Sequence, residues 1–517
     1  MRDIICATLL LVSPNMNEAH SQTDAAASRP YGLEPGEYSV GFQLLEEQDH
    51  SRVVTGGASP STTHPRPIRT YIWYPARVSD DAQRMRFGRY AALADEDIWP
   101  IEIAGNLRAK LKYSRRAIAR SLGPEGFEIL LKRPVLAVEN AEALKGPFPL
   151  IVIGQGLYFE SPVAFAALSE YLAGQGFVVA TCPLVGTNSP IVNFDVQGLE
   201  TEVRDLEFVI AQARRFTFVS PDKLGVFGFD QGGFVALILA MRNADVDAFM
   251  SVSSGVAGSY IPDYFVASPH FDPLALRVPW LHSQSAEFGP LPAESLFEAA
   301  VYSERYLLFT KGMGHADYTS YALIEDRKVM QGYPGYPAAT PEALEGHKAV
   351  SHYVANFFAA YLTGDAESLA FLSQDPEEAI PGSSMTLEYR PAKPASITYE
   401  EFVQAVIAGQ VDQAIDEVRA LRETEPDHIL LKETYLERIV LSLRDTWGYS
   451  EEVMPVIRFR AELFPTSLGS QWMLAEGHVA VGDYPAAIEV YNGLLEQNPE
   501  NIYTSYFKSR LEWLHRQ

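Results

Sequence analysis

The stretch KLGVFGFDQGGFVAL, which runs from Lys223 to Leu237, decides the fold of this chain. Its first half is a short apolar run of the kind that forms a strand buried on both faces, and its second half opens a helix. Between them, residues 228–232 (GFDQG) match the nucleophile elbow G-x-S-x-G, a tight strand-to-helix turn that needs small residues on either side. Asp230 stands where the nucleophilic serine is expected. The function depends on whether this carboxylate attacks a substrate or marks a lost activity.

Short apolar runs on both sides of this stretch predict further strands of the same sheet. A helical stripe formed by Leu199, Val203, Leu206 and Ile210 separates two of them. Strands and helices that alternate in this way indicate an α/β fold, with a mostly parallel sheet flanked by helices. The predicted strands are Glu37–Leu45, Ile68–Tyr74, Phe148–Ile153, Gly176–Thr181, Lys223–Phe229, Val246–Val252, Pro279–Ser283 and Tyr306–Thr310.

Length, charge and cysteine content bound the possible functions. A chain of 517 residues is long for one domain, so two or more are expected. The formal net charge of -25 argues against nucleic acid and anionic membranes as partners, because phosphate groups would be repelled. No stretch beyond the N-terminus is long and apolar enough to predict a membrane span. The sequence indicates neither a metal site nor a cofactor, since Cys6 and Cys182 are the only cysteines.

The first residues have the pattern of a secretory signal peptide. Arg2 precedes the apolar run Ile4–Val12, and Ala19-His20-Ser21 offers a small-x-small cleavage site. We therefore expect residues 1–21 to be a signal peptide, 22–36 to be a linker, and the protein to be periplasmic or secreted. The alternative is a frayed N-terminus of a cytosolic protein.

The rest of the chain divides into two regions. Residues 37–385 carry the α/β pattern, with an insertion at about 79–146 that is either a basic lid or a solvated helix face. Residues 395–517 contain segments that repeat every 34 to 39 residues or so and resemble the tetratricopeptide repeat. This resemblance implies a surface that can bind a protein partner, and the alternative is an ordinary helical cap on the first domain. The matching positions are Gly409, Ala414, Leu421 and Pro426; Gly448, Val453 and Pro465; and Gly482, Ala487, Leu494 and Pro499.

Residues from about 37 to 375 resemble an α/β-hydrolase of the platelet-activating-factor acetylhydrolase and dienelactone hydrolase group. Besides the elbow, the resemblance rests on IRTYIWYPA (68–76), FPLIVIGQGLYFESP (148–162), KGMGHADYTSY (311–321) and HYVANFFAAYLTGD (352–365). It implies the order nucleophile, acid, histidine along the chain. It also implies a small-molecule substrate.

The resemblance assigns roles to individual residues. His315, in a glycine-containing loop after a strand, is the expected catalytic base. Backbone N–H groups of Gln231 and of Gly156 or Leu157 would form the oxyanion hole. For the acid, residues 253–254 at one strand end are both serine, Glu287 follows the next strand, and Asp317 is close to His315 in sequence. We choose Glu287 as the acid and expect Tyr158 and Trp280 in the substrate pocket.

An aspartate at the elbow resembles epoxide hydrolases and haloalkane dehalogenases. There the carboxylate attacks an electrophilic carbon and forms an ester, which a histidine-activated water hydrolyses. An aspartate is a poor nucleophile for ester substrates, since attack on an acyl carbon would give a labile anhydride. The sequence thus predicts a hydrolase that acts on an ester-like, epoxide or alkyl-halide molecule. The alternative is an inactive homologue that binds a ligand or a protein through its helical repeats.

Overall fold

A computed structural model describes residues 33–55, 63–79, 81–96, 124–156, 161–189, 192–258, 261–323, 340–393 and 397–517. The expected signal peptide, most of the linker, the basic helix face within the insertion, and Leu157 and Tyr158 lie outside these residues. The chain forms two compact units, Met1–Ala392 and Lys393–Gln517. In the part of the chain that is described, no helix has the length and apolar character that crossing a membrane requires.

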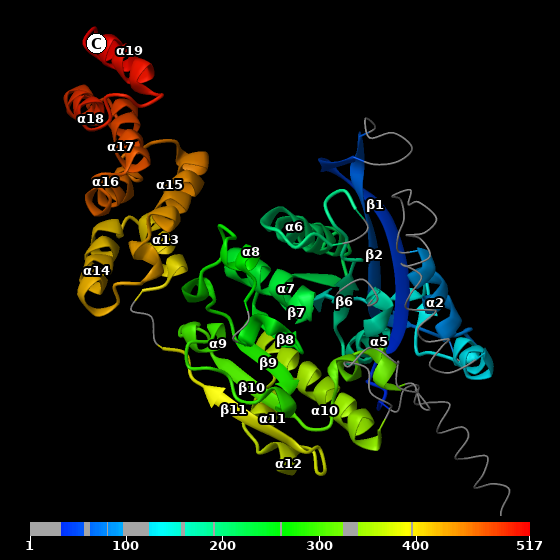
Figure 1. The fold of residues 1–517 in the computed structure, drawn as a ribbon. Helices are drawn as coiled ribbons and strands as arrows, with labels where there is room; N and C mark the ends of the chain where they lie inside the picture. The colour runs from blue at the N-terminus through cyan, green and yellow to red at the C-terminus, as the bar shows by residue number, and fades with distance from the viewer. Residues whose placement is uncertain are drawn as a thin grey trace, which may run out of the picture. The chain divides into compact units, whose positions relative to one another are not determined.

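The first unit is built on one mixed sheet, shown in Figure 1. Its order is β11-β10-β9-β8-β7-β5-β6-β2-β1-β3, with β4 paired to β2. The run from β6 to β10 is parallel. β2 pairs antiparallel with β1 and β6, β11 pairs antiparallel with β10, and β1 pairs parallel with β3. The strands are β1 (Ser39–Thr55), β2 (Thr63–Arg77), β3 (Val138–Glu139), β4 (Glu142–Ala143), β5 (Phe148–Gly154), β6 (Val178–Thr181), β7 (Val219–Phe229), β8 (Ala248–Val252), β9 (Trp280–Ser285), β10 (Arg305–Thr310) and β11 (Met385–Arg390). All eight predicted strands are present, but β1 extends well beyond its expected end at Leu45, to Thr55.

Helices cover both faces of this sheet, which confirms the predicted fold class. Along β5, Ile151 and Ile153 belong to one hydrophobic core while Leu150 and Val152 belong to the other. The first core also contains α2 (Phe87–Glu96), α5 (Ala166–Gly174) and α10 (Pro341–Phe358), and the second contains α6 (Val196–Ala213) and α7 (Gln231–Arg242). Shorter helices are α8 (Asp263–Val266), α9 (Leu296–Ala299), α11 (Ala366–Leu372) and α12 (Pro376–Ala379).

The described part of the insertion is attached to β2 and α5 by buried polar contacts. The indole N–H of Trp73 donates to Tyr90 Oη at 2.8 Å, and that hydroxyl donates to Glu170 Oε1 at 2.6 Å. Glu170 Oε2 accepts the backbone N–H of Leu136 at 2.8 Å. Burial raises the pKa of Glu170 to about 7. The two described segments of the insertion, residues 81–96 and 124–146, are therefore both part of the fold of the first unit.

The second unit contains pairs of helices, and each pair coincides with one of the sequence repeats. Gly409, Gly448 and Gly482 each lie between the two helices of a pair, with φ of 74°, 70° and 80°, a conformation that glycine adopts without steric cost. A proline follows two residues after α14, α16 and α18 end. The helices are α13 (Tyr399–Ile407), α14 (Val411–Thr424), α15 (Glu433–Trp447), α16 (Met454–Leu463), α17 (Leu468–Ala480), α18 (Tyr484–Gln497) and α19 (Thr504–Leu514).

Candidate active site

The turn between β7 and α7 holds Asp230 in a strained conformation. Its φ of 51° and ψ of -123° lie outside the regions that non-glycine residues favour. The flanking glycines permit this turn, because a Cβ on Gly228 would lie 2.6 Å from the carbonyl oxygen of Gly232, and one on Gly232 would lie 2.1 Å from that of Gly154. The backbone therefore presents the Asp230 carboxylate at the carboxyl end of the sheet.

The same end of the sheet has a topological switch point. β5 continues to β6 on one side and its neighbour β7 continues to β8 on the other, so the connections leave these two adjacent strands in opposite directions. Gly154 pairs in register with Gly228, which brings the loop after β5 beside the turn at Asp230. Open α/β sheets bind their ligands in the crevice at such points.

His315 approaches Asp230 from the loop after β10. It opens a short 3-10 helix, η6 (His315–Tyr318), and its Nε2 lies 4.0 Å from Asp230 Oδ1. The imidazole stacks on Phe229, with ring centroids 4.6 Å apart and planes at 21°. Burial lowers the pKa of His315, and the Asp230 charge opposes this effect only in part. The imidazole is therefore neutral near pH 7 and can accept a proton.

Ser253, rather than Glu287, hydrogen-bonds the other nitrogen of this histidine. Ser253 follows β8, and its Oγ lies 2.8 Å from His315 Nδ1. Glu287 instead accepts hydrogen bonds from the Ser285 hydroxyl and, at 3.2 Å, from the backbone N–H of Gly312. The carboxylate of Asp317 is buried and accepts the backbone N–H of Gly314 at 2.7 Å. The strand end at 253–254, where the sequence has no carboxylate, therefore supplies the partner of His315 as a serine hydroxyl.

The structure describes two of the three expected backbone donors. Gln231 is the first residue of α7, so its N–H has no acceptor within the helix. Gly156 ends the described part of the loop after β5. The Gln231 side chain is buried and accepts a hydrogen bond from Tyr264 Oη at 2.9 Å. Ser254 Oγ donates to the Asp230 carbonyl at 2.7 Å, which fixes the turn from the other side.

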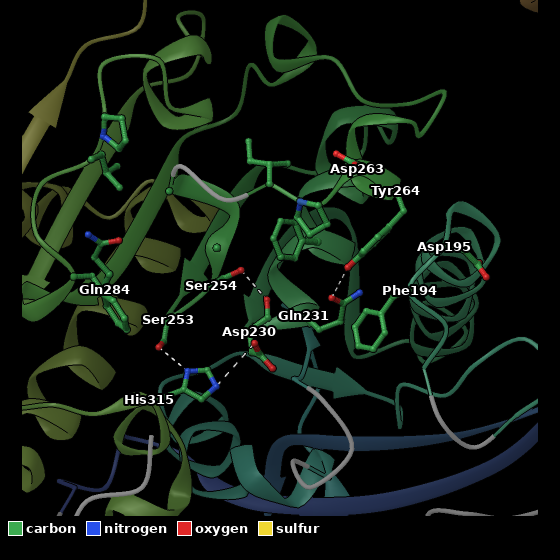
Figure 2. A pocket seen from close by; sticks show the side chains of 18 of the residues that line it. Phe194, Asp195, Asp230, Gln231, Ser253, Ser254, Asp263, Tyr264, Gln284 and His315 are labelled. Carbon is green, nitrogen blue, oxygen red and sulfur yellow. Dashed lines mark hydrogen bonds and ion pairs between the residues drawn. The ribbon is translucent and has the colours of Figure 1, made fainter. Parts of the chain in front are cut away.

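Asp230, Ser253 and His315 face a common pocket of about 1330 Å³, shown in Figure 2. Among the lining residues that the structure describes there is no lysine or arginine, and the acidic ones are Asp195, Asp230 and Asp263. The described residues also contain no cluster of histidine, cysteine or carboxylate side chains suited to a metal ion. Most of the other side chains are apolar: Phe194, Val196, Phe234, Ile261, Phe288 and Leu291, with Pro262, Pro290 and Pro292.

Trp280 does not belong to this pocket, which corrects the expectation from the sequence. It is fully buried at the start of β9, where it packs against Phe249 and Phe297 in the second core. Its indole N–H donates to Ser251 Oγ at 2.9 Å. Trp280 is the first residue of β9, so it lies at the opposite end of the strand from the pocket, and alternation points its side chain into the helix layer.

Comparison with known proteins adds little to this description. No family model matches the chain. Among solved structures, the chain is similar to a ferulic acid esterase from Streptomyces cinnamoneus, with a TM-score of 0.48 and 22% sequence identity over 68% of this chain and 98% of that chain. The strand order and the strained turn of the structure itself define the first unit as an α/β-hydrolase fold.

Proposed function

We propose that this protein is a hydrolase that opens a small uncharged epoxide or alkyl halide, with Asp230 as nucleophile and His315 as base. The observation that carries the proposal is the Asp230 carboxylate on a strained turn, with an imidazole nitrogen 4.0 Å from it and an apolar pocket in front. Strained backbone is concentrated at functional sites, because it costs stability and persists only where the surroundings enforce it.

The first step needs no base. A carboxylate oxygen of Asp230 attacks the electrophilic carbon and forms an ester, while the epoxide C–O bond opens and its oxygen takes a proton from water, or a halide leaves. An ionised carboxylate is the ordinary state of aspartate near neutral pH. The apolar lining supports this step, because a poorly hydrated carboxylate is a better nucleophile than one in bulk water.

The second step regenerates the enzyme. A water molecule between His315 and the ester gives its proton to Nε2 and attacks the carbonyl carbon of the alkylated Asp230. The backbone N–H of Gln231, with a second donor from the loop after β5, would stabilise the negative oxygen that forms there. The proton on Nε2 then passes to the departing oxygen, which is one of the original carboxylate oxygens, so the product leaves as an alcohol and the water oxygen stays in Asp230.

The test is mass spectrometry of the full chain after reaction with styrene oxide and with 1-bromobutane. We expect His315→Gln to accumulate an adduct on Asp230, and Asp230→Asn to gain none. In H₂¹⁸O, wild type should incorporate ¹⁸O into Asp230 during turnover. Asp245→Asn, which changes an exposed aspartate, should behave as wild type. An absence of adduct and of ¹⁸O with both compounds would contradict the proposal.

One observation favours a second candidate, a binding protein without hydrolytic activity. The hydrogen-bond partner of His315 Nδ1 is a serine hydroxyl at 2.8 Å, and a hydroxyl stabilises an imidazolium less than a carboxylate does. In this alternative the pocket holds a ligand, and residues 395–517 bind a protein partner. Tight binding of an uncharged ligand by a chain that shows neither adduct nor turnover would favour it.

A further inference from the structure

The imidazole of His315 lies between a hydroxyl and a carboxylate. The two groups have exchanged the places expected at this fold, because the carboxylate is at the elbow and the hydroxyl is at the strand end. Ser253 Oγ lies 2.8 Å from Nδ1, at the strand end where an acid is expected, and Asp230 Oδ1 lies 4.0 Å from Nε2, at the elbow where a serine is expected. Figure 2 shows the three side chains in a row along the pocket floor. A hydroxyl, an imidazole and a carboxylate in sequence are the components of a serine triad.

Electrostatics favours the tautomer that activates the hydroxyl. A neutral imidazole carries one proton, and the Asp230 carboxylate faces Nε2. A lone pair on Nε2 would be repelled by that charge, whereas an N–H is attracted to it. With the proton on Nε2, Nδ1 is an acceptor and the Ser253 hydroxyl donates to it. Alkylation of Asp230 would remove the charge and free Nε2 to act as the base in the hydrolysis proposed above.

Ser253, like Asp230, has a positive φ, which few residues other than glycine adopt. Ser253 has a φ of 43°, and it lies directly between β8 and the short 3-10 helix η3 (Gly255–Ala257). Its N–H donates to the carbonyl of Ser283 at 2.8 Å, which ties the turn to the end of β9. Two adjacent parallel strands thus each end in a strained residue that faces His315. Strain of this kind is evidence for function when it is observed at a pocket.

We propose that Ser253 is a second nucleophile, which shares His315 and the pocket with Asp230 and cleaves small uncharged esters. The inference goes beyond the proposed function, because it assigns a different nucleophile and a different bond. Both Ser253 and Ser254 line the pocket, but Ser253 is partly exposed, whereas Ser254 is buried and its hydroxyl donates to the Asp230 carbonyl. Gly255 also lines the pocket, so backbone without a side chain faces the space beside Ser253.

The reaction balances without any further reagent. The Ser253 hydroxyl gives its proton to His315 Nδ1 as Oγ attacks the acyl carbon, and the imidazolium is stabilised by the Asp230 carboxylate. The same proton passes to the departing alcohol as the ester C–O bond breaks and acyl-Ser253 remains. Water then gives a proton to Nδ1 and attacks the acyl carbon, which releases the acid and returns the proton to Ser253 Oγ.

The test uses the full chain, a fluorophosphonate that phosphonylates activated serines with loss of fluoride, and p-nitrophenyl acetate. We expect the phosphonate on Ser253, and its loss in Ser253→Ala and His315→Gln. Ester hydrolysis should fall at least about 100-fold in both variants, the usual contribution of a positioned base or its nucleophile. Ser373→Ala, which changes an exposed serine of the same unit, should match wild type.

Two further variants separate this proposal from the one at Asp230. Ser253→Ala should still form the Asp230 adduct with styrene oxide, and Asp230→Asn should still accept the phosphonate at a reduced rate. Ser253→Cys should be alkylated by iodoacetamide far faster than the buried Cys182, which reports on the site even if Ser253→Ala unfolds. The inference is overturned if the phosphonate attaches elsewhere or nowhere, or if ester hydrolysis is unchanged in Ser253→Ala.

Discussion

Phe229, the residue that precedes the elbow position, stacks on the imidazole of His315 with ring centroids 4.6 Å apart. The last residue of β7 therefore orients the base that the loop after β10 supplies. Because Phe229 is fully buried, it cannot turn away without disturbing the core. The packing of Phe229 therefore fixes the imidazole of His315 relative to the elbow, so the charge of Asp230 acts on an imidazole whose position does not change.

This arrangement predicts the titration of His315. Burial penalises the protonated imidazole and lowers its pKa, and the Asp230 charge acts in the opposite direction. We expect an NMR titration midpoint below 6.5 in wild type and a lower one in Asp230→Asn, which loses the stabilising charge. Any step that uses neutral His315 as base should speed up as pH rises through the midpoint and level off above it. A midpoint above 6.5 would show that the imidazolium is stabilised more strongly than the structure indicates.

Gly233→Ala should distort the turn. A Cβ on Gly233 would lie 2.2 Å from Ser254 Oγ and 2.6 Å from Ser254 Cβ, and that hydroxyl holds the Asp230 carbonyl. We expect a loss of about 1–3 kcal/mol in the free energy of unfolding, measured in urea, because overpacking of a closed site forces backbone shifts.

The control for this variant is Gly493→Ala in α18, where an added Cβ meets nothing within 4 Å. It should stabilise the second unit by up to about 1 kcal/mol through helix propensity. Adding Ser254→Gly to Gly233→Ala should recover part of the loss, since both close contacts disappear. Equal effects of the two alanine substitutions would argue against the tight packing of the turn.

The strands and the elbow could be predicted from the sequence because their signals are local. Val226 and Phe227 stand in a short apolar run, and the glycines around Asp230 have spacings that only a tight turn requires. β11 was not predicted, because an edge strand with one exposed face, MTLEYR, has few apolar residues. The hydrolase fold therefore extends to Ala392, beyond the end at 385 that composition indicated.

The partners of the site residues could not be read in the same way. Which group meets His315 Nδ1 depends on the φ of Ser253, and nothing in the local sequence marks a serine that adopts 43°. Trp280 was misplaced for a different reason. Its neighbour Leu281 faces the opposite core, so a shift of one residue along β9 decides which side of the sheet a side chain occupies.

His282 makes the fold sensitive to acid. It is fully buried on β9, where Nδ1 lies 2.8 Å from Ser251 Oγ and Nε2 lies 3.3 Å from Gln284 Oε1, and burial lowers its pKa to about 4. Between pH 6.5 and 4 the unfolded chain binds a proton that the folded chain does not, so stability falls as pH falls.

For His282 alone the loss across that range is about 3 kcal/mol. We expect His282→Gln to be less stable than wild type at pH 7 but to lose less stability on acidification to pH 4. Urea unfolding at a series of pH values measures both curves. Parallel curves would mean that His282 is protonated in the folded protein at the same pH as in the unfolded chain.

Arg460 explains why the middle repeat is weak in sequence. It lies twelve residues after Gly448, as Leu421 and Leu494 lie twelve residues after their glycines, and it is equally buried. Its Nη2 is 3.1 Å from Glu433 Oε1 and 3.3 Å from Glu437 Oε2. An ion pair therefore occupies the place of a leucine contact.

Replacing this arginine should distinguish how much its charge and how much its buried volume contribute to the stability of the second unit. Arg460→Ala leaves a cavity and an unpaired Glu433, and we expect it to destabilise the second unit by about 3 kcal/mol. Arg460→Leu restores the residue of the other repeats. Glu433 keeps solvent contact and the hydroxyl of Ser470 at 2.6 Å, so the expected cost is below about 1 kcal/mol. Hydrogen exchange over residues 397–517 measures both variants without interference from the first unit. If Arg460→Leu proved as damaging as Arg460→Ala, the ion pair itself, rather than the filled space, would be what stabilises the middle helix pair.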